Sequence, residues 1–189
     1  MDSIEDRTQH VILETDRLRF ATWRRDDWTE FQKLATDPLV VRYLGTGEPW
    51  SDARVQEFVN RQCENWEKFG ICLWKLLPKD NDTLIGICGL QHLPEGPDVE
   101  IGWWLAPSCW GKGFATEAAR HALAYGFDVN HLERIVAIAQ SANRDSLRVM
   151  EKIGMRFERE AVHKGIRVVL YAVTHETFQT LKGKGGDGA

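Results

Sequence analysis

The fold is decided by one stretch of the chain, Pro107-Ser108-Cys109-Trp110-Gly111-Lys112-Gly113-Phe114-Ala115-Thr116-Glu117. It lies between an alternating apolar segment, Val99–Leu105, and an alanine-rich segment with the spacing of a helix. The two glycines let the backbone approach a ligand closely, and the first turn of the helix leaves N–H groups unpaired at the positive end of its dipole. The stretch therefore predicts a strand, an anion-binding loop and a helix, an arrangement that suits phosphate and especially pyrophosphate.

The length of 189 residues is sufficient for one domain with a substantial core, and no interior segment has the composition of a linker. The two ends are polar and lack the apolar side chains that offset the entropy of ordering. We therefore expect a flexible N-terminus over residues 1–10, a single domain over 11–182, and a disordered Gly-rich tail over 183–189.

Charge and composition exclude some classes of protein. The formal net charge of −4 argues against direct nucleic-acid binding, because phosphate contacts need clustered Lys and Arg. Residues 1–6 do not resemble a signal peptide, and no run of about 18 apolar residues occurs, so we expect a cytoplasmic protein that does not contact the membrane. The four cysteines form no CxxC pair and the histidines lack metal-ligand spacing, so we expect reduced thiols and no metal.

Hydrophobic periodicity places the regular elements along the chain. The expected strands cover residues 13–22, 71–77, 83–90, 99–105, 134–139, 155–162 and 166–173. The expected helices begin at Asp26 or Asp27, at Ser51, at Ala115 and at Asn143, and the first of them ends or kinks at Pro38. Short loops between neighbouring strands favour antiparallel pairing. The order predicts an α/β (α+β) fold, a mixed, mostly antiparallel central sheet of about seven strands with helices on both faces.

Spacing separates three kinds of glycine loop. A Walker loop needs GxxxxGK[ST], but Lys112 lies between the glycines and Gly113 follows it. A dinucleotide fingerprint needs a small residue where Thr116 stands and an acid at the end of the next strand, where the chain has Ile138-Ala139-Gln140. The pattern that remains is [Q/R]xxGx[G/A], with Trp110 in the place of Gln or Arg.

With this pattern the chain resembles the GNAT superfamily of acyl-coenzyme A N-acetyltransferases. It is most similar to the branch of the ribosomal-protein N-terminal acetyltransferases (Rim-type), which often carries Trp-Gly-x-Gly-[FY]-[AG]-[ST]-Glu-Ala, as residues 110–118 do here. Further blocks at residues 13–18, 100–105 and 143–155 occur in the order of the family. Four blocks in register, over about residues 11–175, make the resemblance specific.

The resemblance implies acetyl-CoA as co-substrate, bound along the loop and the preceding strand. The implied contacts are Trp103, Trp104, Leu105, Trp110, Gly111, Lys112, Gly113, Phe114, Ala115, Thr116 and Asn143. Backbone N–H groups of the loop would hold the pyrophosphate, Lys112 would add charge, and the pantetheine arm would pair with the strand edge. Core packing of Trp103 or Trp104 and a helix N-cap role for Asn143 stay open as alternatives.

Two residues are candidates for the chemistry of acetyl transfer. Glu100 is the candidate general base, because an alkyl amine with a pKa of about 10 must lose a proton before it attacks. Its alternative is a salt-bridged strand glutamate. Ser146 is the candidate acid or hydrogen-bond donor to the departing sulfur, and its alternative is an ordinary residue in the first turn of a helix. Cys109 has no nearby His in sequence to activate it as a nucleophile.

The leading hypothesis is an acetyl-CoA-dependent N-acetyltransferase that acts on a primary amine by direct attack in a ternary complex. The branch favours a protein or peptide N-terminus as acceptor. The alternatives are a small amine, such as a polyamine, an aminoglycoside or an amino acid, and a non-catalytic coenzyme A-binding module. Eight tryptophans exceed the obvious needs of the core, which suggests an aromatic surface for a homodimer or for the acceptor.

Overall fold

A computed structural model describes residues 10–94 and 96–184, and its centre is one eight-stranded sheet in the order β1-β2-β3-β4-β5-β6-β8-β7. The strands are β1 (Val11–Glu14), β2 (Leu18–Ala21), β3 (Leu73–Pro78), β4 (Gly86–His92), β5 (Val99–Leu105), β6 (Arg134–Ala139), β7 (Arg156–His163) and β8 (Ile166–Thr174). Only β5 and β6 run parallel, and every other neighbouring pair is antiparallel. The predicted fold class is confirmed.

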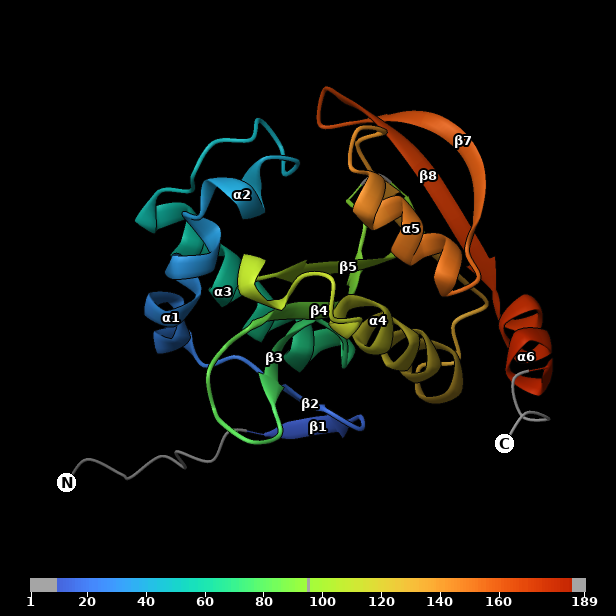
Figure 1. Cartoon of the computed structure of the whole chain (residues 1–189), viewed down its shortest axis with the longest axis horizontal. Coiled ribbons are helices and arrows are strands. Elements are labelled where there is room, and N and C mark those ends of the chain that lie inside the picture. Colours follow the sequence, from blue (N-terminus) through green and yellow to red (C-terminus); the bar gives the residue numbers. More distant parts are fainter. Residues whose placement is uncertain (1–9, 95, 185–189) are drawn as a thin grey trace.

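Helices cover both faces of the sheet. They are α1 (Trp28–Ala35), α2 (Pro38–Val41), α3 (Asp52–Phe69), α4 (Phe114–Ala124), α5 (Arg144–Lys152) and α6 (His175–Lys184). Figure 1 shows α4 in front of β4 and β5, while α3 passes behind these strands. A π-helical turn, Tyr125–Val129, follows directly after α4.

The first predicted strand is two strands. The chain turns between β1 and β2, where the backbone N–H of Thr15 donates to the carbonyl of Leu18 at 2.9 Å. The N–H of Leu18 donates in return to the Thr15 hydroxyl at 2.9 Å. Because a threonine side chain can bond nearby backbone groups in this way, it ends an extended segment that hydrophobic alternation alone would continue. The sheet therefore has eight strands rather than about seven.

The C-terminal helix α6 carries no strong sequence signal. Its buried anchor is Phe178, whose ring lies 5.1 Å from that of Phe127 in the π-helical turn. A second ring contact joins Phe127 to His175 at 5.5 Å. Few aromatic contacts on a polar segment do not produce helical periodicity, so the sequence does not predict this helix. It runs to Lys184, and the predicted tail therefore begins inside it. Residues 1–9 of the expected N-terminus and 185–189 of the tail lie outside the described residues.

An aromatic cluster fills the space between α1, α3 and β5. The ring of Trp104 stacks on Phe31 and Phe58 at centroid distances of 5.7 Å and 5.6 Å, and Trp50 meets it edge-on at 5.0 Å. Trp23 packs against Phe31 in the same cluster. Much of the tryptophan content thus contributes to the core, where aromatic pairs add stability beyond their buried area.

Strands β5 and β6 stay together for only two pairs of residues. Val99 lies opposite Ile135 and Glu100 opposite Val136, and no further pair is formed between them. Beyond this point β5 continues along β4, whereas β6 continues along β8. The sheet therefore splits after Glu100, and the edge of β5 that would face β6 is left without a neighbouring strand.

A buried ion pair connects β3 to the segment before α1. The ammonium of Lys75, with 2% of its side chain exposed, lies 2.5 Å from the Asp27 carboxylate. We predict that Asp27→Ala lowers the free energy of unfolding by about 3 kcal/mol, because it leaves a buried charge without its partner.

The matched control is Asp26→Ala, which removes a neighbouring carboxylate that pairs with Arg24 at the surface. It should cost less than about 0.5 kcal/mol. Urea unfolding measures both variants, and equal losses would contradict the assignment.

Candidate active site

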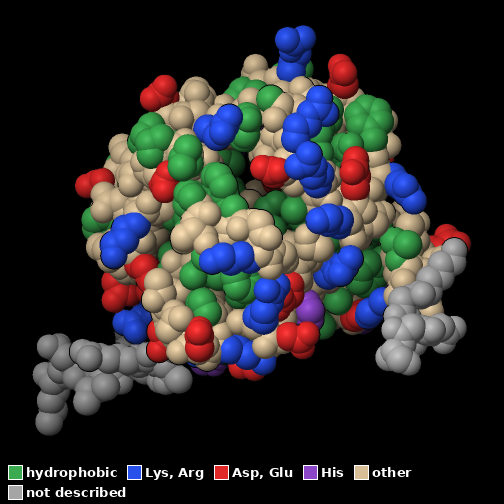
Figure 2. Space-filling view, viewed as in Figure 1, with side chains coloured by type: hydrophobic (Ala, Val, Ile, Leu, Met, Phe, Trp, Pro, Cys, Tyr) green, Lys and Arg blue, Asp and Glu red, His purple; other side chains and the backbone are tan. Residues whose placement is uncertain are grey.

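A cavity of about 1010 Å³ occupies the split between β5 and β6. Its walls come from the end of β5, the loop before α4, the start of α5, the region of α2 and α3, and the turn between β7 and β8. The predicted site residues that line it are Glu100, Trp103, Trp104, Leu105, Trp110, Gly111, Gly113, Phe114, Ala115, Thr116, Asn143 and Ser146. Figure 2 shows the opening as a hollow near the centre of this face, with Lys and Arg side chains gathered beside it.

The glycine loop has the geometry of an anion-binding site. Gly111 and Gly113 have φ angles of 71° and 81°, in the left-handed region that side chains disfavour. A Cβ on Gly111 would meet no atom within 4 Å, so the space beside the loop is open. No side chain caps α4, and its first helical bond runs from the N–H of Glu117 to the carbonyl of Gly113. The N–H groups of residues 114–116 are therefore available to an anion, and the loop fits a pyrophosphate.

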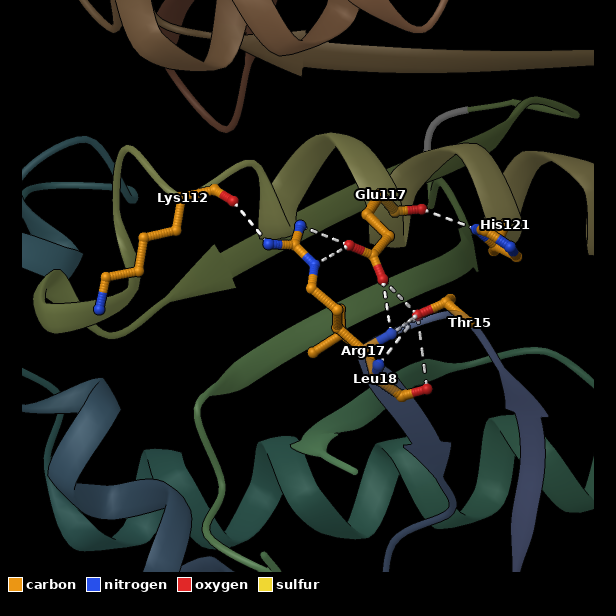
Figure 3. Close-up of polar contacts among 6 residues, drawn as sticks. All are labelled: Thr15, Arg17, Leu18, Lys112, Glu117 and His121. Carbon is orange, nitrogen blue, oxygen red and sulfur yellow. Dashed lines mark hydrogen bonds and ion pairs between the residues drawn. The ribbon is translucent and has the colours of Figure 1, made fainter. Parts of the chain in front are cut away.

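The side chains of Trp110 and Lys112 lie in different surroundings. The indole N–H of Trp110 donates to the carbonyl of Leu105 at 2.8 Å, which ties the loop to the end of β5. The side chain of Lys112 is outside the cavity lining and extends away from Arg17, as Figure 3 shows. The charge contact of Lys112 with a bound pyrophosphate stays a prediction.

Glu100 is held in a buried, hydrogen-bonded position on β5. Only 9% of the residue is exposed, and the side-chain amide of Gln91 donates to its carboxylate at 2.8 Å. Burial raises the pKa of Glu100 to about 7, against the opposing effects of the Gln91 hydrogen bond and the Lys164 charge. The polar contact found for this carboxylate among residues 10–94 and 96–184 is the one with Gln91, and the Lys164 charge acts on its pKa. A carboxyl group with such a pKa suits proton transfer near neutrality.

Asn143 and Ser146 lie together at the start of α5. The side-chain oxygen of Asn143 accepts the backbone N–H of Ser146 at 3.2 Å, which is the N-cap role considered from the sequence. Both residues also line the cavity. The cap uses the oxygen of Asn143 and the backbone of Ser146, so the amide nitrogen and the hydroxyl take no part in it.

Sequence reasoning missed several residues of the site. Gln91 lies directly opposite Glu100 in the antiparallel register of β4 and β5, and a register argument would have found it. Arg54 and Arg61, on α3, line the cavity beside Arg42. No local signal marks Arg54 and Arg61, since each occupies an ordinary polar position of a helix.

Among the described residues, no group of three His, Cys, Asp or Glu side chains could hold a metal ion. In the same part of the chain, no helix combines the length and apolar character needed to cross a membrane. Three of the four cysteines are buried, and Cys109 is partly exposed.

Comparison with known proteins identifies the family. Residues 17–156 match the acetyltransferase (GNAT) domain, which is well over half of the chain. The chain belongs to the GNAT acetyltransferases. The uncharacterized N-acetyltransferase YnaD of Bacillus subtilis (strain 168) is 35% identical over 157 residues, which are 81% of this chain and 89% of YnaD. The protein is therefore an enzyme of the N-acetyltransferase class, as predicted.

Solved structures of this family share the fold. A GNAT-family acetyltransferase from Bacillus anthracis has a TM-score of 0.73 at 29% identity, with 87% of this chain and 98% of that chain covered. RimL, a ribosomal L7/L12 alpha-N-protein acetyltransferase solved in complex with coenzyme A, has a TM-score of 0.74 at 15% identity, with 87% and 98% covered. At that identity the second likeness concerns the fold alone.

The raised pKa of Glu100 predicts a pH-dependent stability. Since the folded protein binds this proton more tightly than the unfolded chain, whose ordinary pKa is 4.5, the free energy of unfolding should fall as pH rises from about 4.5 to about 7. Glu100→Gln should flatten this part of the curve, measured by urea unfolding at several pH values. Glu64→Gln, at an exposed position of α3, is the control and should follow the wild-type protein. Identical curves for all three proteins would contradict the assignment.

Proposed function

We propose that the protein transfers the acetyl group of acetyl-CoA to a primary amine, in particular the N-terminus of a protein or peptide, by direct attack in a ternary complex. One observation carries the proposal: a single cavity contains both the anion-binding loop and a buried carboxyl group with a pKa of about 7. The first feature suits the donor and the second suits deprotonation of the acceptor.

The donor side follows from the split sheet. The loop and the first turn of α4 present backbone N–H groups to a pyrophosphate. The edge of β5 that faces the split offers peptide groups to an extended arm that contains amides, in the manner of an added strand. Acetyl-CoA would supply an activated acyl group at this place, and the amide nitrogen of Asn143, a residue of the cavity wall, would bind the same arm.

The acceptor side contains the groups that handle protons. Glu100 would accept a proton from the incoming ammonium group, directly or through water, and Gln91 would hold its carboxylate in place. The hydroxyl of Ser146 would donate to the departing sulfur, whose thiol has a pKa of about 8.5 and needs little help. On this assignment Glu100 is the more important of the two residues.

The side of the cavity near α2 and α3, here called the acceptor wall, has a charge that favours some amines over others. Arg42, Arg54 and Arg61 outnumber the single acid of that wall, Glu57, and none of these three arginines forms an ion pair within the described residues. Repulsion from three guanidinium groups disfavours polyamines and aminoglycosides, which carry several positive charges. A peptide N-terminus has one amine on a neutral backbone and is favoured, and a free amino acid, whose carboxylate would pair with an arginine, is the second candidate.

The direct test is release of thiol from acetyl-CoA in the presence of an acceptor panel. We expect turnover with peptides that have a free N-terminus, and none with the same peptides after N-terminal blocking. Spermidine and an aminoglycoside should be poor acceptors. Binding of coenzyme A without turnover on any amine of the panel would overturn the enzymatic proposal, and preference for spermidine would overturn the acceptor assignment.

The role of Glu100 predicts a specific pH profile. Glu100→Gln should lower kcat/KM by about 100-fold near neutral pH, since it removes the general base. The deficit should shrink at alkaline pH, where the amine loses its proton to solvent. Initial rates between about pH 6 and about pH 10 measure this. A loss of the same size at every pH would assign Glu100 to positioning.

Ser146 predicts a smaller effect. Ser146→Ala should lower kcat by about three- to tenfold and leave the KM for acetyl-CoA unchanged, because a thiolate is a good leaving group. Asp145→Ala, beside it in the exposed first turn of α5, serves as the control for the integrity of the helix. No change in kcat for Ser146→Ala would remove the hydroxyl from the reaction.

A further inference from the structure

Arg17, from the turn between β1 and β2, reaches across to the glycine loop (Figure 3). Its guanidinium donates to the carbonyl oxygen of Lys112 at 2.9 Å and, through Nε, to the Glu117 carboxylate at 2.6 Å. The guanidinium carbon also lies 4.3 Å from the centre of the Phe114 ring. One side chain from a distant part of the sequence therefore contacts the loop at Lys112 and the first turn of α4 at Phe114 and Glu117.

The contact with Lys112 determines which way the loop peptide faces. In a trans peptide the carbonyl of one residue and the N–H of the next point in opposite directions. The carbonyl of Lys112 is held on Arg17, outside the cavity lining, whereas Gly113 lines the cavity. Holding this carbonyl keeps the N–H of Gly113 turned toward the cavity and keeps a carbonyl oxygen away from a bound anion.

Glu117 and Thr15 hold Arg17 in this orientation. The other carboxylate oxygen of Glu117 accepts the Thr15 hydroxyl at 2.5 Å and the backbone N–H of Arg17 at 3.1 Å. Burial raises the pKa of Glu117, but the hydrogen bonds from Thr15 and Arg17 and the Arg17 charge outweigh it and hold the pKa below its usual value. The Glu117 carboxylate neutralises the Arg17 guanidinium. The arrangement therefore fixes the orientation of the loop more than it adds positive charge beside it.

We propose that Thr15, Arg17 and Glu117, here called the Arg17 clamp, orient the glycine loop so that its N–H groups bind the pyrophosphate of coenzyme A. Arg17 is thus a positioning residue for the donor, and the inference rests on the proposed use of coenzyme A at this loop. The clamp explains why the chain needs an arginine, whose planar fork reaches two acceptors at once, where a lysine would reach one.

The test compares donors with and without the pyrophosphate. Arg17→Lys keeps the charge but loses the fork, and it should raise the Kd for coenzyme A, measured by calorimetry, by about tenfold. The kcat/KM for acetyl-CoA should fall by a similar factor. The kcat/KM for S-acetyl-pantetheine, which lacks the pyrophosphate, should stay unchanged. A purely structural defect would affect both donors.

A matched control and a second variant keep the test decisive. Arg19→Lys alters another paired arginine on β2, which binds Asp82 and the carbonyls of Pro78 and Asn81. It should leave the Kd for coenzyme A unchanged. Glu117→Gln should weaken binding through the same clamp, so that adding it to Arg17→Lys costs less than the product of the two single effects.

The outcomes of these measurements distinguish failure of the Arg17 clamp from failure of the proposed function. Unchanged coenzyme A affinity in Arg17→Lys, or equal losses with both donors, would overturn the Arg17 clamp while leaving the proposed function intact. Absence of coenzyme A binding by the wild-type protein would overturn both. A tenfold loss confined to the donors that contain the pyrophosphate would establish the clamp.

Discussion

The separation of β5 from β6 after two residue pairs is the constraint on which the rest of the structure depends. A parallel pair that continued would leave no cavity at the centre of the sheet and no exposed strand edge. Strand β5 stays paired with β4, and β6 stays paired with β8. Only the backbone N–H and C=O groups on the facing edges of β5 and β6 therefore lose their hydrogen-bond partners. The opening therefore costs the sheet few hydrogen bonds, and the loop, α4 and α5 are arranged around it.

The chemistry of the site depends on burial as much as on residue type. Glu100 belongs to a strand that is covered on both sides, and its carboxyl group retains one good donor, Gln91. Removal from water favours the neutral form, and a single neutral hydrogen bond does not restore the ionised one. The result is a proton acceptor near neutrality in the same cavity as an anion-binding loop.

Local patterns in the sequence predicted most of the fold and much of the candidate site. The positive φ angles of Gly111 and Gly113 follow from glycine spacing, and the cap of α5 follows from Asn143. Errors arose where long-range contacts compete with local pattern. The Thr15 turn divided a segment that alternation joins, and the polar helix α6 is anchored by long-range contacts of Phe178 with Phe127 and of Lys182 with Asp128.

The sequence by itself determined the family, the order of the elements and the loop that faces the donor, because these depend on spacing along the chain. The tertiary structure alone decided that Arg17 contacts the loop, since Arg17 and Lys112 lie 95 residues apart in the sequence. It also decided the pKa of Glu100 and the basic character of the acceptor wall. Burial and the meeting of distant side chains are properties of the packed chain, and no local pattern encodes them.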